Sequence, residues 1–280
     1  ANGTVVCWGD NSDGQSTVPS GLAGVTQVSA SWAHTVALKS DGTVICWGAG
    51  TTNTGTMPNF GQSIVPAGLS GVREVSAGFG HTVVLKSDGT VQAWGLNRTG
   101  QCNTPTSLLS ITRIAGGGDT TAAIRTDGTL FCWGSNVNGQ CDVPTGLAGI
   151  TRVAVGSSHT AALKSDGTVR CWGAGTTNTG SAPNFGQSIV PSQLNSVSSI
   201  GVGDYHTIAV RSTGIVACWG WNVFGQCTVP SGTSGVTQAT GGSAWSMALK
   251  STGTVVAWGS NTSGVTSTSN LSGITQVAAG

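Results

Sequence analysis

The chain has 280 residues, of which 45 are glycine, and its 11 basic and 10 acidic residues leave a formal net charge of +1 at pH 7. Only 8% of the residues are charged and no apolar run approaches ~20 residues, which excludes a coiled coil, a charged disordered tail and a membrane span. The charge is evenly spread and lacks the basic stripe that a nucleic-acid partner requires.

One stretch recurs along the chain. It reads HTVALKSDGTVICWG at residues 34–48, and each copy joins two runs of β-branched residues through a turn such as Asp-Gly, which predicts a β-hairpin with a tight two-residue turn. Further copies begin at His81, His159 and His206, weaker ones at Thr120 and Trp245, and a half copy, NGTVVCWG, at Asn2. Because a hairpin of this size cannot bury its apolar face alone, the recurrence predicts units stacked side by side.

A complete unit contains four predicted strands. In the first unit these are A at residues 25–30, B at 34–39, C at 43–48 and a short D at 62–66. Seven Trp-Gly pairs, spaced 39 or 47 residues apart, mark seven such units, so we predict an all-β fold, a seven-bladed β-propeller in a single domain over residues 1–280. Each tryptophan is expected to pack between adjacent sheets.

The two ends of the chain are expected to share one blade. An A strand begins at Ile274, and the opening NGTVVCWG supplies the C strand of the same blade, which closes the ring and removes an exposed edge. No B strand is available for this closing blade. We therefore expect either that the natural chain continues beyond one end or that another molecule donates the strand.

Cysteines and histidines follow the repeat. Five of the eight cysteines precede Trp-Gly, where two copies have alanine instead, which indicates small buried side chains. The close pairs Cys132–Cys141 and Cys218–Cys227 can form disulfides in an oxidising compartment. The four histidines share one repeat position, which predicts a blade-building hydrogen bond, and without a CxxC pair or Cys/His cluster no metal is expected.

Strand parity places the candidate binding residues on one face. In an up-and-down blade the A–B and C–D loops emerge at one end, and here these loops hold most aromatic residues outside the Trp-Gly pairs. Aromatic side chains on a rigid scaffold are typical anchors of a binding surface. We predict partner contacts by Trp32, Phe79, Tyr205, Trp221 and Phe224, with Asp119 and Asp204 as polar contacts beside them.

Two C–D loops carry nearly identical insertions. Residues 49–66 read AGTTNTGTMPNFGQSIVP, residues 174–191 agree with them at 16 of 18 positions, and each insertion lengthens its loop by eight residues. A duplication without function explains this likeness, and so do two equivalent sugar or peptide sites. The candidate binding residues of the second hypothesis are Asn53, Asn59 and Phe60 in one loop and Asn178, Asn184 and Phe185 in the other.

The repeat HTVALKSDGTVICWG with its following Gly-Gln resembles the regulator-of-chromosome-condensation repeat family over essentially the whole chain, a resemblance that implies a seven-bladed propeller. The loop motifs WGDNSDGQSTVP, SNVNGQCDVP and WNVFGQCTVP look most like those of bacterial β-lactamase-inhibitory propellers. That resemblance implies a secreted bacterial protein that blocks an enzyme by capping it.

These observations favour a recognition platform over an enzyme. The acids lie mostly in turns, and neither a GxSxG motif nor a phosphate-cradling loop is present. We predict a non-enzymatic, extracellular or cell-surface protein without a cofactor that binds a protein partner through one face, as an enzyme inhibitor does. The alternative is a carbohydrate-binding propeller, or the head domain of a larger adhesin or fibre.

Overall fold

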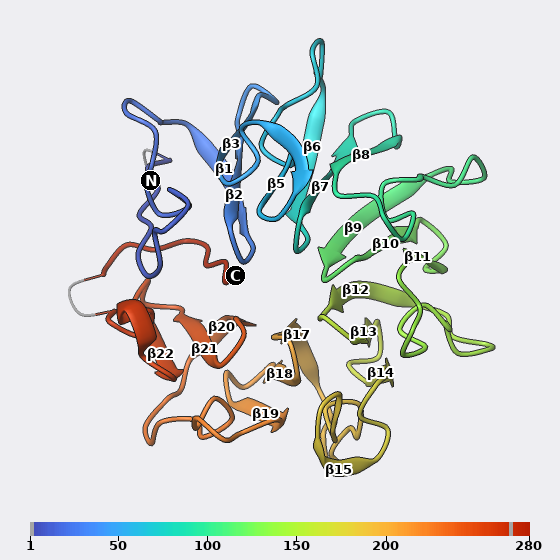
Figure 1. The fold of residues 1–280 in the computed structure, drawn as a ribbon. Coiled ribbons are helices and arrows are strands. Elements are labelled where there is room, and N and C mark those ends of the chain that lie inside the picture. The colour runs from blue at the N-terminus through green and yellow to red at the C-terminus, as the bar shows by residue number, and fades with distance from the viewer. Residues whose placement is uncertain (1–2, 269–270) are drawn as a thin grey trace.

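The computed structural model describes residues 3–268 and 271–280, and it consists almost entirely of β-strands. Six three-stranded antiparallel sheets lie around a central axis (Figure 1), each with its strands in chain order from the axis outward, so we name them inner, central and outer. The sheets are β1 (Val25–Ala30), β2 (His34–Lys39) and β3 (Val44–Gly48); β6 (Val72–Ala77), β7 (His81–Lys86) and β8 (Val91–Gly95); β9 (Ile111–Gly117), β10 (Thr120–Arg125) and β11 (Leu130–Gly134); β12 (Ile150–Val155), β13 (His159–Lys164) and β14 (Val169–Gly173); β17 (Val197–Val202), β18 (His206–Arg211) and β19 (Val216–Gly220); β20 (Val236–Gly241), β21 (Trp245–Lys250) and β22 (Val255–Gly259).

The hydrophobic core lies between neighbouring sheets. Ile208 and Val210 of β18 share one cluster with Val236 of β20 and Trp258 of β22, and Trp258 is buried. The alternating apolar residues of each strand therefore meet those of the next sheet, as face-to-face packing requires. The expected packing of the Trp-Gly tryptophans between sheets is confirmed at this position.

The fourth strand predicted for each blade is wrong, because each of the six radial sheets has three strands among residues 3–268 and 271–280. At residues 62–66 the backbone donors go to local turns, from Ser63 N to Gly50 O over 3.1 Å and from Ile64 N to Gly61 O over 3.0 Å. Pro66 has no N–H to donate. The segment therefore has few donors left for a β-ladder.

The predicted two-residue turn between central and outer strands is also wrong. Lys39 N donates to Thr43 O over 2.9 Å, and Gly42 has a φ of 82° while Asp41 has no positive φ. This geometry is a three-residue loop with glycine in the left-handed region. Asp41 Oδ1 completes it by accepting from Thr43 N over 2.9 Å.

Both insertions fold into small hairpins that the sequence reasoning did not predict. The first is β4 (Asn53–Thr56) with β5 (Asn59–Phe60), and the second is β15 (Asn178–Ser181) with β16 (Asn184–Phe185), in the same register. A short 3-10 helix, η1 (Thr262–Gly264), occupies the corresponding outer loop of the last sheet.

Backbone hydrogen bonds confirm the predicted faces. The loop after β3 bonds the loop after β1, from Ala49 N to Ala33 O over 2.7 Å, and Trp221 N bonds Tyr205 O over 2.8 Å in the same way. At the opposite end, Ser40 N donates to Gly24 O over 2.9 Å. Inner–central loops and the loops that follow the outer strands therefore form one face, which we call the loop face.

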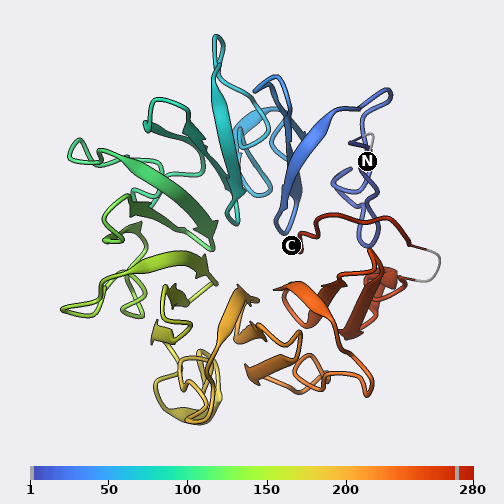
Figure 2. The same ribbon diagram turned by 180° about the vertical axis from the view of Figure 1, so that it is seen from behind.

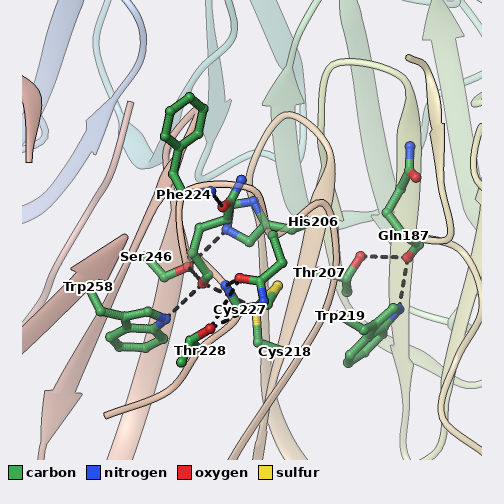
Figure 3. Close-up of a disulfide and its surroundings, with 12 residues drawn as sticks. Gln187, His206, Thr207, Cys218, Trp219, Phe224, Cys227, Thr228, Ser246 and Trp258 are labelled. Carbon is green, nitrogen blue, oxygen red and sulfur yellow. Dashed lines mark hydrogen bonds between the residues drawn. A yellow bond between two sulfur atoms is a disulfide. The ribbon is translucent and has the colours of Figure 1, made fainter. Parts of the chain in front are cut away.

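A recurrent hydrogen-bond unit joins each sheet to the preceding one. The carbonyl oxygen of Gln187 accepts from Thr207 Oγ1 and from Trp219 Nε1, each over 2.9 Å (Figure 3). A hydroxyl of the central strand and a tryptophan indole converge in this way on six glutamines, Gln15, Gln62, Gln101, Gln140, Gln187 and Gln226.

The four histidines extend this unit. His206 Nε2 lies 2.9 Å from Ser246 Oγ (Figure 3), and since that hydroxyl donates to Gln226 O, the histidine donates from Nε2. Burial lowers the pKa of His206 to about 4 and that of His34 to about 3, so both are neutral. The predicted blade-building role is confirmed, with a hydroxyl on the neighbouring strand as partner. Gly203 leaves room for the ring, because a Cβ there would lie 2.2 Å from His206 Cε1.

The two ends of the chain lie side by side between the last and first sheets (Figures 1 and 2). Trp8 Nε1 donates to Val265 O over 2.9 Å, and the amide of Gln276 exchanges bonds of 3.1 and 3.0 Å with the backbone of Val28. Both terminal segments thus lie where a shared closing blade places them. Residues 3–8 and 274–280 are not assigned to any strand, and the number of seven blades stays a prediction.

Candidate functional site

Two aromatic groups occupy the loop face. In the first, Trp32 and Phe79 stack across neighbouring inner–central loops, with ring centroids 5.0 Å apart and planes 13° apart. Trp32 is 47% exposed. The pair lies at the wall of a central channel of about 940 Å³, and Phe79 is held by a 2.9 Å bond from its N–H to Gly118 O.

The second group, which we call the aromatic cluster, comprises Phe185, Tyr205, Trp221 and Phe224. Phe185 lies 5.5 Å from Tyr205 and 5.7 Å from Trp221, and Trp221 lies edge-on to Phe224 at 5.3 Å. Pairs of this geometry contribute about 0.5–1.5 kcal/mol beyond burial, so the rings fix one another. Phe224 is nevertheless 51% exposed and points away from the sheet below it (Figure 3).

The two insertions differ in their surroundings despite their matching sequences. Phe60 is buried with its ring close to Gly80, and the Arg98 guanidinium lies 5.3 Å from its ring centroid. Arg98 also donates to Gly55 O over 3.2 Å, so this side chain holds the first hairpin in place. In the second insertion Phe185 meets the aromatic cluster instead.

The four asparagines of the insertions have structural bonds. Asn59 Oδ1 accepts from Gly50 N and Asn184 Oδ1 from Gly175 N, both over 2.9 Å. Asn53 and Asn178 accept from the N–H two residues further on, Gly55 and Gly180. Their side-chain oxygens therefore shape the hairpins, and their predicted role in ligand binding stays a prediction.

The two aspartates on the loop face lie apart, each bonded to a different loop. Asp204 accepts a short hydrogen bond from Ser157 Oγ, and Asp119 accepts from Gln101 Nε2 over 3.2 Å. Burial raises the pKa of Asp119 above its usual value. Both carboxylates stand on the loop face as expected, but each also has a local partner.

Three exposed apolar residues on this face were missed. Val137 and Val223 are 87% and 75% exposed in the loops after the outer strands, and Met57 is 61% exposed at the first hairpin tip. A search restricted to aromatic residues could not find them. Valine is uncommon at turn positions, so Val137 and Val223 within asparagine-containing turns are the signal that the sequence carries.

One of the two proposed cysteine pairs forms a disulfide. Cys218 on β19 is bonded to Cys227 in the following loop (Figure 3). Cys132 and Cys141 have the same spacing, and their sulfurs lie next to each other. The disulfide ties the loop that carries Trp221 and Phe224 to its sheet.

The central channel contains an unusual carboxylate, Glu74 on β6. At the equivalent position Gln27 forms two bonds of 3.0 Å with the backbone N–H and C=O of Val75 on the next inner strand. Glu74 accepts from Ile114 N, but its Oε2 is buried without a partner. Burial raises the pKa of Glu74 to about 7, opposed by the nearby Arg113.

Among residues 3–268 and 271–280, no group of three or more His, Cys, Asp or Glu side chains could hold a metal ion. No helix in the same ranges is long and apolar enough to cross a membrane.

The radial sheets, the hydrogen-bond unit between them and the loop face define a β-propeller of hairpin repeats. The chain belongs to the regulator of chromosome condensation (RCC1) repeat family, whose repeat matches residues 25–53, 72–101, 111–140, 150–178 and 197–226, more than half of the chain. A search of curated protein sequences finds no significant match.

Solved structures agree with this fold. Prp20p from Saccharomyces cerevisiae, described with its binding to Gsp1p and histones, is 17% identical over 92% of this chain and 82% of that chain, with a TM-score of 0.72. The ectodomain of the Arabidopsis thaliana receptor kinase ACR4 is 20% identical over 91% and 87%, with a TM-score of 0.68. At such identities the likeness shows the fold alone.

Proposed function

We propose that this propeller is a non-enzymatic recognition platform that binds a protein partner through its loop face. The observation that carries the proposal is the aromatic cluster, where Phe224 and Val223 are exposed beside packed Trp221. Interface anchors are typically large aromatic side chains at the centre of a patch. Because the rings already fix one another, little ordering cost is expected on binding.

The relatives support this mode of action. Prp20p is described with its binding properties to Gsp1p and histones, and yeast RCC1 (Prp20) has also been solved with Kap60 bound. These partners belong to those proteins. They support protein binding as the general use of the fold, and the partner of this chain is then set by its own loops.

We further propose an extracellular or cell-surface location in a bacterium and a role as an enzyme inhibitor that caps its target. The Cys218–Cys227 disulfide supports the location, since such bonds persist in oxidising compartments. The loop motifs that resemble bacterial inhibitory propellers support the role.

A carbohydrate ligand is the second candidate. The stacked rings of Trp32 and Phe79 line the same channel as Ser31, Ser157 and Asp204, so the channel wall combines aromatic faces with hydrogen-bonding groups. Binding sites for small polar ligands commonly have this composition. The site would lie at the Trp32–Phe79 pair, because the insertion asparagines already hold their hairpins.

The test compares capture of the source's extracellular proteins with binding to a glycan array. The variants are Trp221→Ala with Phe224→Ala for the aromatic cluster and Trp32→Ala for the stacked pair. The controls are Ile215→Ala and Leu109→Ala, which truncate residues of similar exposure, 54% and 68%, on the opposite face. Loss of an anchor should weaken binding by about 2 kcal/mol or more, roughly 30-fold.

The outcomes separate the two candidates. A purified partner whose binding fails with the cluster variant and survives in both controls supports protein recognition. Glycan binding lost only with Trp32→Ala supports a lectin. If the cluster variant and the controls bind the partner equally well, the proposed face is wrong.

A further inference from the structure

The third residues of the six inner strands form a ring around the central channel, which we call the channel ring. Each inner strand runs toward the loop face, so the channel ring lies near the opposite end of the channel. Its members all line the channel, and they are Gln27, Glu74, Arg113, Arg152, Ser199 and Gln238. These side chains therefore decide what the channel offers to a solute at this end.

Glutamine in the channel ring binds the backbone of the next inner strand. Gln27 Oε1 accepts from Val75 N, and Gln27 Nε2 donates to Val75 O. The backbone groups of Val75 thus point away from their own central strand and toward the preceding inner strand. Val153 and Ile200 pair with their central strands in the same register as Val75, so their N–H groups point the same way.

The neighbouring inner strands β9, β12 and β17 (Figure 1) lack such a clamp. A guanidinium has no acceptor atom, so arginine in the channel ring cannot bond the next N–H. Among residues 3–268 and 271–280, the side chains of Arg113, Arg152 and Ser199 form no hydrogen bond, and no side chain accepts from Val153 N or Ile200 N. This arc of the channel wall therefore presents many more hydrogen-bond donors than acceptors.

The same arc concentrates positive charge. Arg113 and Arg152 are exposed, and neither forms an ion pair within the described residues. Burial raises the pKa of Glu74, and both arginines oppose that rise, so both guanidiniums lie within electrostatic reach of this one carboxylate. Like charges on neighbouring strands repel, and an anion between them would offset the repulsion.

We propose that this end of the channel binds a phosphate group, free or as part of a small phosphomonoester, between Arg113 and Arg152. The two guanidinium groups supply the charge and paired N–H donors. Val153 N, Ile200 N and the Ser199 hydroxyl donate to the remaining oxygens, in the way that backbone N–H groups form anion sites elsewhere.

The number of donors selects phosphate over a carboxylate. A carboxylate offers two oxygens and one charge, whereas a phosphate group offers at least three oxygens and close to two charges, which matches two guanidinium groups and three further donors. The channel volume of about 940 Å³ lies within the range of small-molecule sites.

The probe is inorganic phosphate, titrated into the 280-residue chain at pH 8 and followed by isothermal titration calorimetry. We expect one site per chain, with a dissociation constant on the order of 1 mM or lower, as befits so small a ligand. Glycerol 3-phosphate distinguishes the two sources: its binding supports a phosphomonoester site, and binding of phosphate alone supports a site for the free ion. Succinate, a dianion with carboxylates only, should bind at least about tenfold more weakly.

Arg113→Ala and Arg152→Ala test the charged groups. Each should weaken phosphate binding about tenfold or more, the usual effect of losing a hydrogen bond between charged groups. The matched control is Arg170→Ala on β14, which removes another exposed arginine without an ion pair and away from the channel, and should leave the affinity unchanged. Glu74→Gln should strengthen binding, because it removes the one acidic residue of the channel ring.

Arg113→Gln tests the backbone donors separately. It places in β9 the residue with which Gln27 clamps Val75, so the new amide should accept from Val153 N and withdraw this donor from the ligand. In the wild type, phosphate should shift the amide NMR signals of Val153 and Ile200. In Arg113→Gln at saturating phosphate, the shift of Val153 should become much smaller while that of Ile200 persists.

Four results would overturn the proposal. These are no saturable phosphate binding, an equal loss of affinity in Arg170→Ala, phosphate-induced amide shifts away from Val153 and Ile200, and binding of succinate as tight as that of phosphate. None of these outcomes involves the aromatic cluster, so the proposed function is tested separately.

Discussion

The carboxylate of Glu74 should make the stability of the propeller depend on pH, and Glu74→Gln should remove that dependence. Glu74 stands where Gln27, Gln238 and Gln276 clamp the next inner strand through one donated and one accepted bond. A carboxylate accepts from the N–H but cannot donate to the carbonyl. Glutamine, or a protonated glutamate, can do both.

The sign follows from the raised pKa. Burial raises the folded-state pKa of Glu74 from 4.5 to about 7, so the folded protein binds this proton more tightly than the unfolded chain. Stability is therefore lost as the pH rises from about 4.5 through about 7. The full shift corresponds to about 3 kcal/mol, and screening by water in the channel reduces this to an expected 1–3 kcal/mol.

Urea denaturation followed by tryptophan fluorescence, at pH 4.5 and pH 8, measures the effect. Glu74→Gln should be more stable than the wild type by about 1–3 kcal/mol at pH 8 and by much less at pH 4.5. The matched control is Gln27→Glu, which places a carboxylate in a complete clamp and should destabilise the protein at pH 8 and much less at pH 4.5. A Glu74→Gln gain that is equal at both pH values, or absent at pH 8, would refute the reasoning.

Three further effects should be measurable by the same denaturation assay. The buried histidines have pKa values lowered to about 3 or 4, so the free energy of unfolding should decrease as the pH falls below about 6.5. In the Glu74→Gln background, His206→Gln should make this decrease with pH smaller. An unchanged pH dependence would contradict the prediction. Phe60→Ala should lower the free energy of unfolding by about 3–5 kcal/mol, and Phe185→Ala by clearly less because Phe185 is only half-buried. Equal losses would mean that the two insertions are packed equivalently. Cys218→Ala should cost about 2–3 kcal/mol under oxidising conditions and little with a reductant present, and a loss unaffected by reductant argues against the disulfide.

The propeller fold could be predicted because its signal is local and repeated. A β-hairpin needs only alternating apolar residues and a glycine turn, and both recur at each copy from His34 onward. The prediction of a fourth strand was wrong because such a strand depends on backbone pairing that the turns at residues 62–66 prevent. Sequence alternation cannot show that Gln62 O is taken by Thr82 and Trp94 of the next sheet.

The sequence predicted which face of the propeller carries the candidate residues, but not how their side chains pack on that face. Strand parity assigns Phe60 and Phe185 to the same kind of loop, and their insertions are almost identical in sequence. Their environments differ because of residues from the next repeat: Gly80 and Arg98 lie against Phe60, whereas Tyr205 and Trp221 lie against Phe185.

The buried hydrogen bonds between sheets depend on the next repeat in the same way. Each central strand of this propeller completes hydrogen bonds of the sheets before and after it, as Ser246 does for His206 and Gln226.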